Sequence, residues 1–213
     1  MPFGYTGQNL PNQTVANSGV FSISEVADLE KQGKFGGSLK FITSQTVTSM
    51  TSAIDFTNVF TDEYEVYYLE TKNVQSSQNG YTTGITIYEN GVLESAGVYD
   101  YGLQGGRASG SFSNGQTTTS AWIHIGADTD NTTANSSNSY CYIYNTRDAS
   151  KFTYVSFIGT GQFGTTYAMR YGGGVLPQAS TVDGFRLRST YSTGQITGEF
   201  KLFGVKQLWV LWD

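Results

Sequence analysis

The sequence ITIYENGVLESAG at residues 85–97 contains the turn that most strongly indicates the fold of this chain. Asn90-Gly91 lies between two apolar-rich runs, and this dipeptide favours the two-residue turn of a β-hairpin, in which both positions have positive φ angles. From Gly37 onward, short β-rich runs alternate with clusters of Gly, Asn, Ser and Asp. Roughly eight to ten short strands at this spacing predict an all-β, jelly-roll-type β-sandwich over residues 37–213.

Period-two alternation within single segments supports the same fold. The run EYEVYYLETKNV at residues 63–74 alternates charged residues with apolar ones, which predicts that the charges point outward and that Val66 and Tyr68 point inward. Two glycine-rich stretches, GLQGGRASGSFSNG at 102–115 and RYGGGVLP at 170–177, are interpreted as loops that present surface.

Composition argues against an enzyme. Charged residues make up 14% of the 213 residues and aromatic residues 15%, and the chain has one histidine and one cysteine. So few titratable groups favour a scaffold that presents surface over one that transfers protons, and no cofactor is expected. A net charge of -5 disfavours binding to the phosphate backbone of nucleic acids.

The sequence also bears on location. No run approaches the roughly 20 apolar residues of a membrane-spanning helix, and MPFGYTGQNLPNQ lacks the basic and apolar regions of a signal peptide. Cys141 has no second cysteine to pair with, so a disulfide scaffold is excluded. We therefore expect synthesis in a reducing cytoplasm and no membrane insertion.

The N-terminal region differs from the rest. Residues 1–20 have no charged side chain, and Phe3, Tyr5, Leu10 and Val15 recur at no regular period. Two interpretations stay open: a floppy terminus, or a docking arm that orders when it is buried against a partner.

A single helix is expected after this arm. In SEVADLEKQG (24–33), Ser22 or Ser24 caps a short helix over 24–32 and Gly33 ends it. Arm and helix together form a predicted attachment region, residues 1–36.

The C-terminus contains a cluster of large apolar residues. The segment KQLWVLWD (206–213) places Trp209, Leu211 and Trp212 beyond the last expected strand. These large side chains require cover. The alternatives are an added edge strand and a contact between subunits.

Few residues suggest chemistry. His124 lacks neighbours at metal-ligand spacing, so a structural or incidental role is favoured. Cys141 alternates with tyrosines and is expected in the core. Asp128 and Asp130 match the first positions of a calcium loop, but Thr133 and Ser139 stand where that loop needs Gly and Glu. No metal site or catalytic residue is therefore assigned.

Tyrosines near loops are the candidate ligand-facing residues. Tyr99 and Tyr101 flank Asp100, and further tyrosines occur at 140, 142, 144, 167 and 171. Aromatic side chains among small polar residues suit sugar binding or a protein–protein patch, and they also suit ordinary sheet packing.

The opening FGYTGQNLPNQTVANSGVFSISEVADLEKQGKFGGSLKFI (3–42) resembles the start of virion structural proteins from marine tailed bacteriophages, especially those that infect cyanobacteria. The strand-like AIDFTN (53–58) and GEFKLFGVK (198–206) add to the resemblance, which covers the first 60 residues and the region 184–206. It implies a non-enzymatic capsid or tail component that carries no active site. The segment QLWVLWD extends beyond the end expected of such chains.

The favoured hypothesis is a decoration or fibre-like protein of the virion that docks on capsid or tail subunits through residues 1–20 and projects the β-sandwich outward. Homotrimers or rings would bury Trp209 and Trp212. The alternative is a receptor- or carbohydrate-binding tail fibre module that contacts a host surface glycan through Tyr99 and Tyr101. An enzyme acting on polysaccharide is the least favoured reading, and it would require a pair of acids in a groove.

Overall fold

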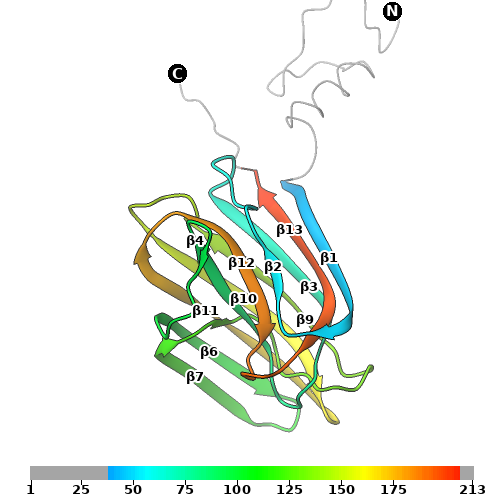
Figure 1. Cartoon of the computed structure of the whole chain (residues 1–213). Helices are drawn as coiled ribbons and strands as arrows, with labels where there is room; N and C mark the ends of the chain where they lie inside the picture. The colour runs from blue at the N-terminus through cyan, green and yellow to red at the C-terminus, as the bar shows by residue number, and fades with distance from the viewer. Residues whose placement is uncertain (1–37, 207–213) are drawn as a thin grey trace, which may run out of the picture. The chain divides into compact units, whose positions relative to one another are not determined.

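The computed structural model of the chain describes residues 38–206. The chain divides between Ser38 and Leu39 into two units, and the second contains two β-sheets packed face to face (Figure 1). The large sheet has eight strands in the order β1 (Leu39–Thr51), β13 (Ile196–Val205), β3 (Val66–Ser76), β9 (Ser137–Tyr144), β10 (Phe152–Phe163), β11 (Thr166–Ala179), β6 (Tyr99–Arg107) and β7 (Phe112–Ser120).

The small sheet lies in front of the large one in Figure 1. It consists of β2 (Ile54–Phe56), β12 (Val182–Ser189), β4 (Thr83–Glu89) and β5 (Val92–Leu93), with β8 (Ile123–His124) also paired to β4. Every pairing between these strands is antiparallel, and the chain crosses repeatedly from one sheet to the other. The predicted all-β, jelly-roll-like β-sandwich is confirmed.

The Asn90-Gly91 hairpin forms as predicted. Its two turn residues have φ angles of 48° and 79°, and Glu89 pairs directly with Val92 across the two-residue loop. Positive φ at both positions is the geometry that favours Asn-Gly, because it matches the twist of the flanking strands.

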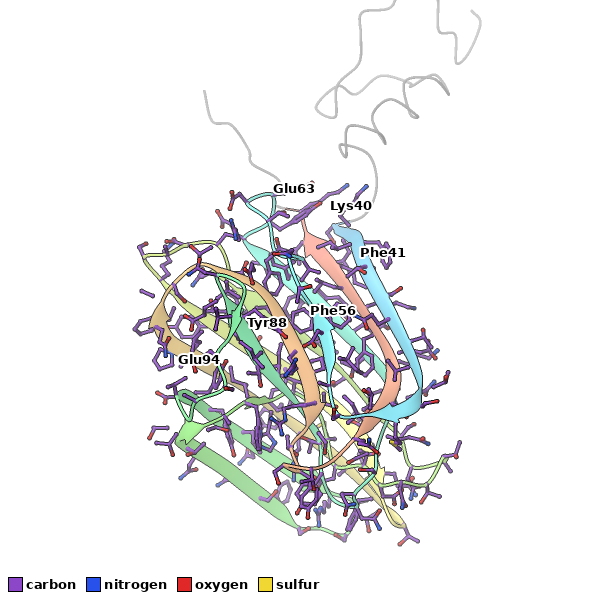
Figure 2. All side chains as sticks on the ribbon, in the orientation of Figure 1. Lys40, Phe41, Phe56, Glu63, Tyr88 and Glu94 are labelled. Carbon is purple, nitrogen blue, oxygen red and sulfur yellow. The ribbon has the colours of Figure 1, made fainter. Side chains whose placement is uncertain are left out.

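The core lies between the two sheets. Alternate residues of the large sheet point into it, as in β10, where Val155 and Phe157 are buried and their strand neighbours are exposed. Phe56 of β2, labelled in Figure 2, stacks on Phe185 of β12 with ring centroids 4.7 Å apart. Cys141 is fully buried, which confirms its predicted core position.

Two predictions about individual segments are wrong. In β3 the buried residues are Tyr67 and Leu69, whereas Val66 and Tyr68 lie on the outer face. The alternation shifts because the strand begins only at Val66, so the phase of the preceding acidic residues does not extend into it. The glycine-rich stretches are also mostly strand: 102–107 belongs to β6 and 112–115 begins β7, with only the turn at 108–111 between them, and 170–177 lies within β11.

Several expectations fall outside the described residues. These are the arm with Phe3, Tyr5, Leu10 and Val15, the helix at 24–32, and the C-terminal Trp209, Leu211 and Trp212. Within residues 38–206 the chain forms no α-helix, and therefore none that could cross a membrane.

Candidate functional site

The cross-strand register lines up outer-face residues of the large sheet in rows that run across the strands. One row crosses all eight strands and changes character halfway. Its members are Phe41, Phe203, Tyr68, Tyr142, Ser156, Gly173, Gly102 and Gln116, each paired with the next. The first four carry large rings, and the next three carry a hydroxymethyl group or no side chain.

The four rings form a continuous aromatic row. Ring centroids lie 5.8 Å apart between Phe41 and Phe203, 6.0 Å between Phe203 and Tyr68, and 5.3 Å between Tyr68 and Tyr142. Phe41, labelled on β1 in Figure 2, is 54% exposed. The other three rings are half-buried, so the row is most exposed at Phe41, on the edge strand.

The small residues form what we call the glycine trough, whose floor is Ser156, Gly173 and Gly102. It is a depression of about 720 Å³ on the outer face, within the usual range of ligand pockets. One side is the adjacent row of Tyr144, Tyr154, Val175 and Asp100, which all line the depression. On the other side, Ile158, Tyr171 and Gln104 form the next row, and the Tyr171 hydroxyl donates a hydrogen bond to Gln104.

The two glycines of the floor are present for different reasons. A Cβ atom on Gly173 would lie 2.5 Å from the backbone oxygen of Val155, so the packing of β11 on β10 requires glycine there. A Cβ atom on Gly102 would meet nothing within 4 Å. Gly102 therefore keeps the trough open without being required by the neighbouring chain.

The trough has acidic and polar groups but no positive charge. Asp100 is the only ionisable carboxylate among its lining residues, and no lysine or arginine is among them. Gln116, Thr117, Thr118 and Ser156 add amide and hydroxyl groups, and the Tyr144 hydroxyl lies 3.3 Å from Ser156 Oγ. The site therefore combines ring surface with hydrogen-bonding groups.

A buried ion cluster braces the strands that carry the trough. Asp128 is 1% exposed; Arg107 Nη2, at the end of β6, lies 2.7 Å from its Oδ2, and Arg170 Nη2 of β11 lies 2.8 Å from its Oδ1. A buried carboxylate held by two guanidinium groups resists displacement, because moving away from both would leave an uncompensated buried charge. Asp128 thus ties β11 to β6, the strand next to the edge strand β7.

Tyr99 does not face a ligand, and that prediction is wrong. Its ring is fully buried, its hydroxyl donates to the Glu94 backbone oxygen at 2.8 Å, and it accepts from the Ile87 backbone N–H at 2.9 Å. Burial raises the pKa of this phenol well above its usual value. Tyr101 lines the trough, but its ring packs against the imidazole of His124 with centroids 4.7 Å apart.

His124 and Cys141 have structural surroundings. Burial, and to a lesser extent the charge of Arg170, lowers the pKa of His124 to about 4, so the imidazole is neutral at neutral pH. Its Nδ1 lies 3.2 Å from Thr82 Oγ1. Burial also raises the pKa of the Cys141 thiol to about 12, which leaves no thiolate at neutral pH.

The acidic loop is occupied by the protein's own donors. Asp130 accepts hydrogen bonds from Asn135 Nδ2 and from the backbone N–H groups of Thr132 and Gly164 at 2.8–3.0 Å. With Asp128 held by two arginines, neither carboxylate is free to ligate a cation. Residues 38–206 contain no group of three or more His, Cys, Asp or Glu residues placed to hold a metal ion.

The trough was not predicted from the sequence. The tyrosines at 142, 144 and 171 were candidates only as members of a larger set, and Gly102 and Gly173 were expected in loops. The available signal was a glycine on each of two strands that alternation places on the outer face, but their alignment depends on a register that the sequence does not reveal.

Comparisons with protein-family models, with curated proteins and with solved structures found no match. The geometry of the large sheet is therefore the basis from which a function is inferred.

We predict that Asp130→Asn destabilises the fold by about 2 kcal/mol at pH 7. Burial alone would raise the pKa of Asp130, but the three donors outweigh it and lower the pKa from 3.8 to about 2. The stabilisation is therefore full above pH 3.8 and disappears as the pH falls through 2. Urea unfolding at pH 7, 4 and 2 measures it.

The control variant is Asp62→Asn, because Asp62 is 83% exposed in its pair with Arg147 and such surface pairs contribute little. A loop that binds calcium would contradict the statement that the protein's own donors satisfy Asp130. In that case millimolar calcium would raise the melting temperature of the wild type and not that of Asp130→Asn.

Proposed function

We propose that the β-sandwich is a non-enzymatic carbohydrate-binding module of a virion structural protein. The observation that carries this proposal is the glycine trough, a depression with a bare floor beside the exposed ring of Tyr154 and the half-buried ring of Tyr144. The virion setting is supported by the resemblance of residues 3–42 and 184–206 to phage structural proteins.

Sugars match the two kinds of surface in the trough. The C–H faces of a pyranose ring pack on aromatic rings, and its hydroxyl groups pair with carboxylate, amide and hydroxyl groups. Tyr154 is 47% exposed and offers ring surface. Asp100, Gln116 and Ser156 offer polar groups along the same depression.

The lining favours binding over hydrolysis. Glycoside hydrolysis generally uses two carboxyl groups about 5–9.5 Å apart. Asp100 is the only carboxylate that lines the trough, and His124, which contacts Tyr101 at its edge, has its pKa lowered to about 4 by burial. These features support a ligand that is held and not cleaved.

We predict that Gly102→Leu lowers the affinity for any glycan that the wild type binds by at least about tenfold. The leucine side chain projects into the open space above Gly102 and fills the floor of the trough. Glycan-array binding, followed by titration with the glycan retained on the array, measures the loss. A melting curve checks that the variant folds.

Thr46→Leu is the matched control, because Thr46 is an exposed outer-face residue of the edge strand β1, far along the same sheet. Equal affinity of the Gly102→Leu variant and the wild type would contradict the proposed site.

The aromatic row favours a second candidate function, a purely structural role in which the large sheet is covered by other virion subunits or by copies of this chain. Exposed apolar surface of this kind commonly marks an interface. Phe41 is 54% exposed at the start of β1, the strand that follows the predicted attachment region.

Because residues 1–36 are the predicted attachment region, we expect that a chain lacking them keeps its melting temperature but no longer binds to particles stripped of this protein. The β-sandwich has its own core, so its fold does not require the arm. Co-sedimentation of the full and shortened chains with particles measures binding. Equal co-sedimentation would show that attachment lies in the β-sandwich or the C-terminus.

A further inference from the structure

We infer that the ligand of the glycine trough is an internal stretch of an uncharged polysaccharide, laid across the strands and continuing over Tyr142 and Tyr68. This inference rests on the proposed function and names the ligand class. The observations behind it are the shape of the row, the spacing of its rings and the charge of the lining.

The trough is an open lane that crosses five strands. It runs from β9, through β10, β11 and β6, to β7, which is the edge strand of the sheet. Four inter-strand spacings of about 4.8 Å make it about 19 Å long. At the β7 end the row finishes with Gln116, and beyond that strand the sheet offers no further side chain.

At the other end the same row continues into rings. Tyr142 is the residue next to Ser156, and Tyr68 follows it with ring centroids 5.3 Å apart. A chain that leaves the floor at Ser156 would therefore pass over the rings of Tyr142 and Tyr68. A pocket that binds the end of a sugar chain is closed on one side, whereas this open lane lets the sugar chain continue beyond it.

The charge of the lining selects against acidic sugars. Asp100 is the only Asp, Glu, Lys, Arg or His residue that lines the trough, and its carboxylate makes no ion pair or side-chain hydrogen bond to any residue between 38 and 206. A uronate or sulfate placed there would meet a like charge without a compensating cation, which is unfavourable. A neutral sugar instead donates its hydroxyl protons to this carboxylate.

The Gln116 side chain likewise has no hydrogen-bond partner among residues 38–206. Gln116 belongs to the same cross-strand row as the trough floor, and it pairs with Gly102 although the two residues are 14 positions apart in the chain. Asp100 and Gln116 thus place an acceptor and an amide at the same end of the lane, near the edge strand. Hydroxyl groups spaced along a sugar chain satisfy both.

The first test is affinity gel electrophoresis of the full chain in gels containing dextran, laminarin, galactomannan, alginate or chondroitin sulfate. We expect retardation by at least one neutral polymer and by neither acidic one. Retardation only by acidic polymers would overturn the ligand class and leave the carbohydrate-binding function in place. Retardation by none of the five, together with an empty glycan array, would overturn both.

The second test is calorimetric titration with oligosaccharides of two and six units prepared from the retarding polymer. We expect the hexamer to bind about tenfold more tightly than the dimer, because only the hexamer both fills the trough and extends onto Tyr142. Tyr142→Ala lowers the affinity for the hexamer more than the affinity for the dimer. Tyr167→Ala is the control, since Tyr167 is 49% exposed on β11 outside the trough.

Equal affinities for dimer and hexamer in the wild type would overturn the through-going chain while the proposed function stands. The competing occupant, a second copy of this chain, is examined by light scattering of the wild type and of Gly102→Leu. A wild-type dimer that becomes monomeric in Gly102→Leu would overturn the inference, and an unchanged mass supports it.

Discussion

The site depends on the alternation of side chains across the large sheet. One face of the interior strands of the large sheet is fixed by burial between the two sheets, where Tyr67, Leu69 and Phe185 have no exposed surface. Because a slip of one residue would turn these side chains to solvent, burial fixes the register. The same register determines which residues lie side by side on the outer face, although those residues are not buried. The positions of the aromatic row and the glycine trough therefore follow from the packing of the core.

Backbone packing and ion pairing support that face from beneath. Gly173 allows β11 to approach β10 more closely than any side chain would permit, and this contact gives the trough a floor of bare backbone. Asp128, held by Arg107 and Arg170, ties the neighbouring ends of β6 and β11 together. A site built on strands held in this way needs little ordering when a ligand binds, so less of the interaction energy is lost.

The sequence predicted local features well and cross-strand features poorly. Asn90-Gly91 specified its hairpin because the turn geometry depends only on those two residues and their neighbours. The burial of Cys141 followed from alternation within one strand. Gly102 and Gly173, by contrast, lie 71 positions apart and meet only through strand pairing. Tyr99 was misplaced because its position near a loop among small polar residues suggested a ligand surface, whereas two backbone groups satisfy its hydroxyl in the core.

The proposed function and the ligand class both require an uncharged glycan on the floor of the trough. Amide chemical shifts of the isotope-labelled full chain, recorded while a neutral oligosaccharide is added, test this contact, because glycine amides report on it without mutation. We expect the largest shifts at Gly102, Ser156 and Gly173, with little change at Thr86 and Arg186 of the small sheet. Shifts concentrated on the small sheet, with the trough unchanged, would contradict it.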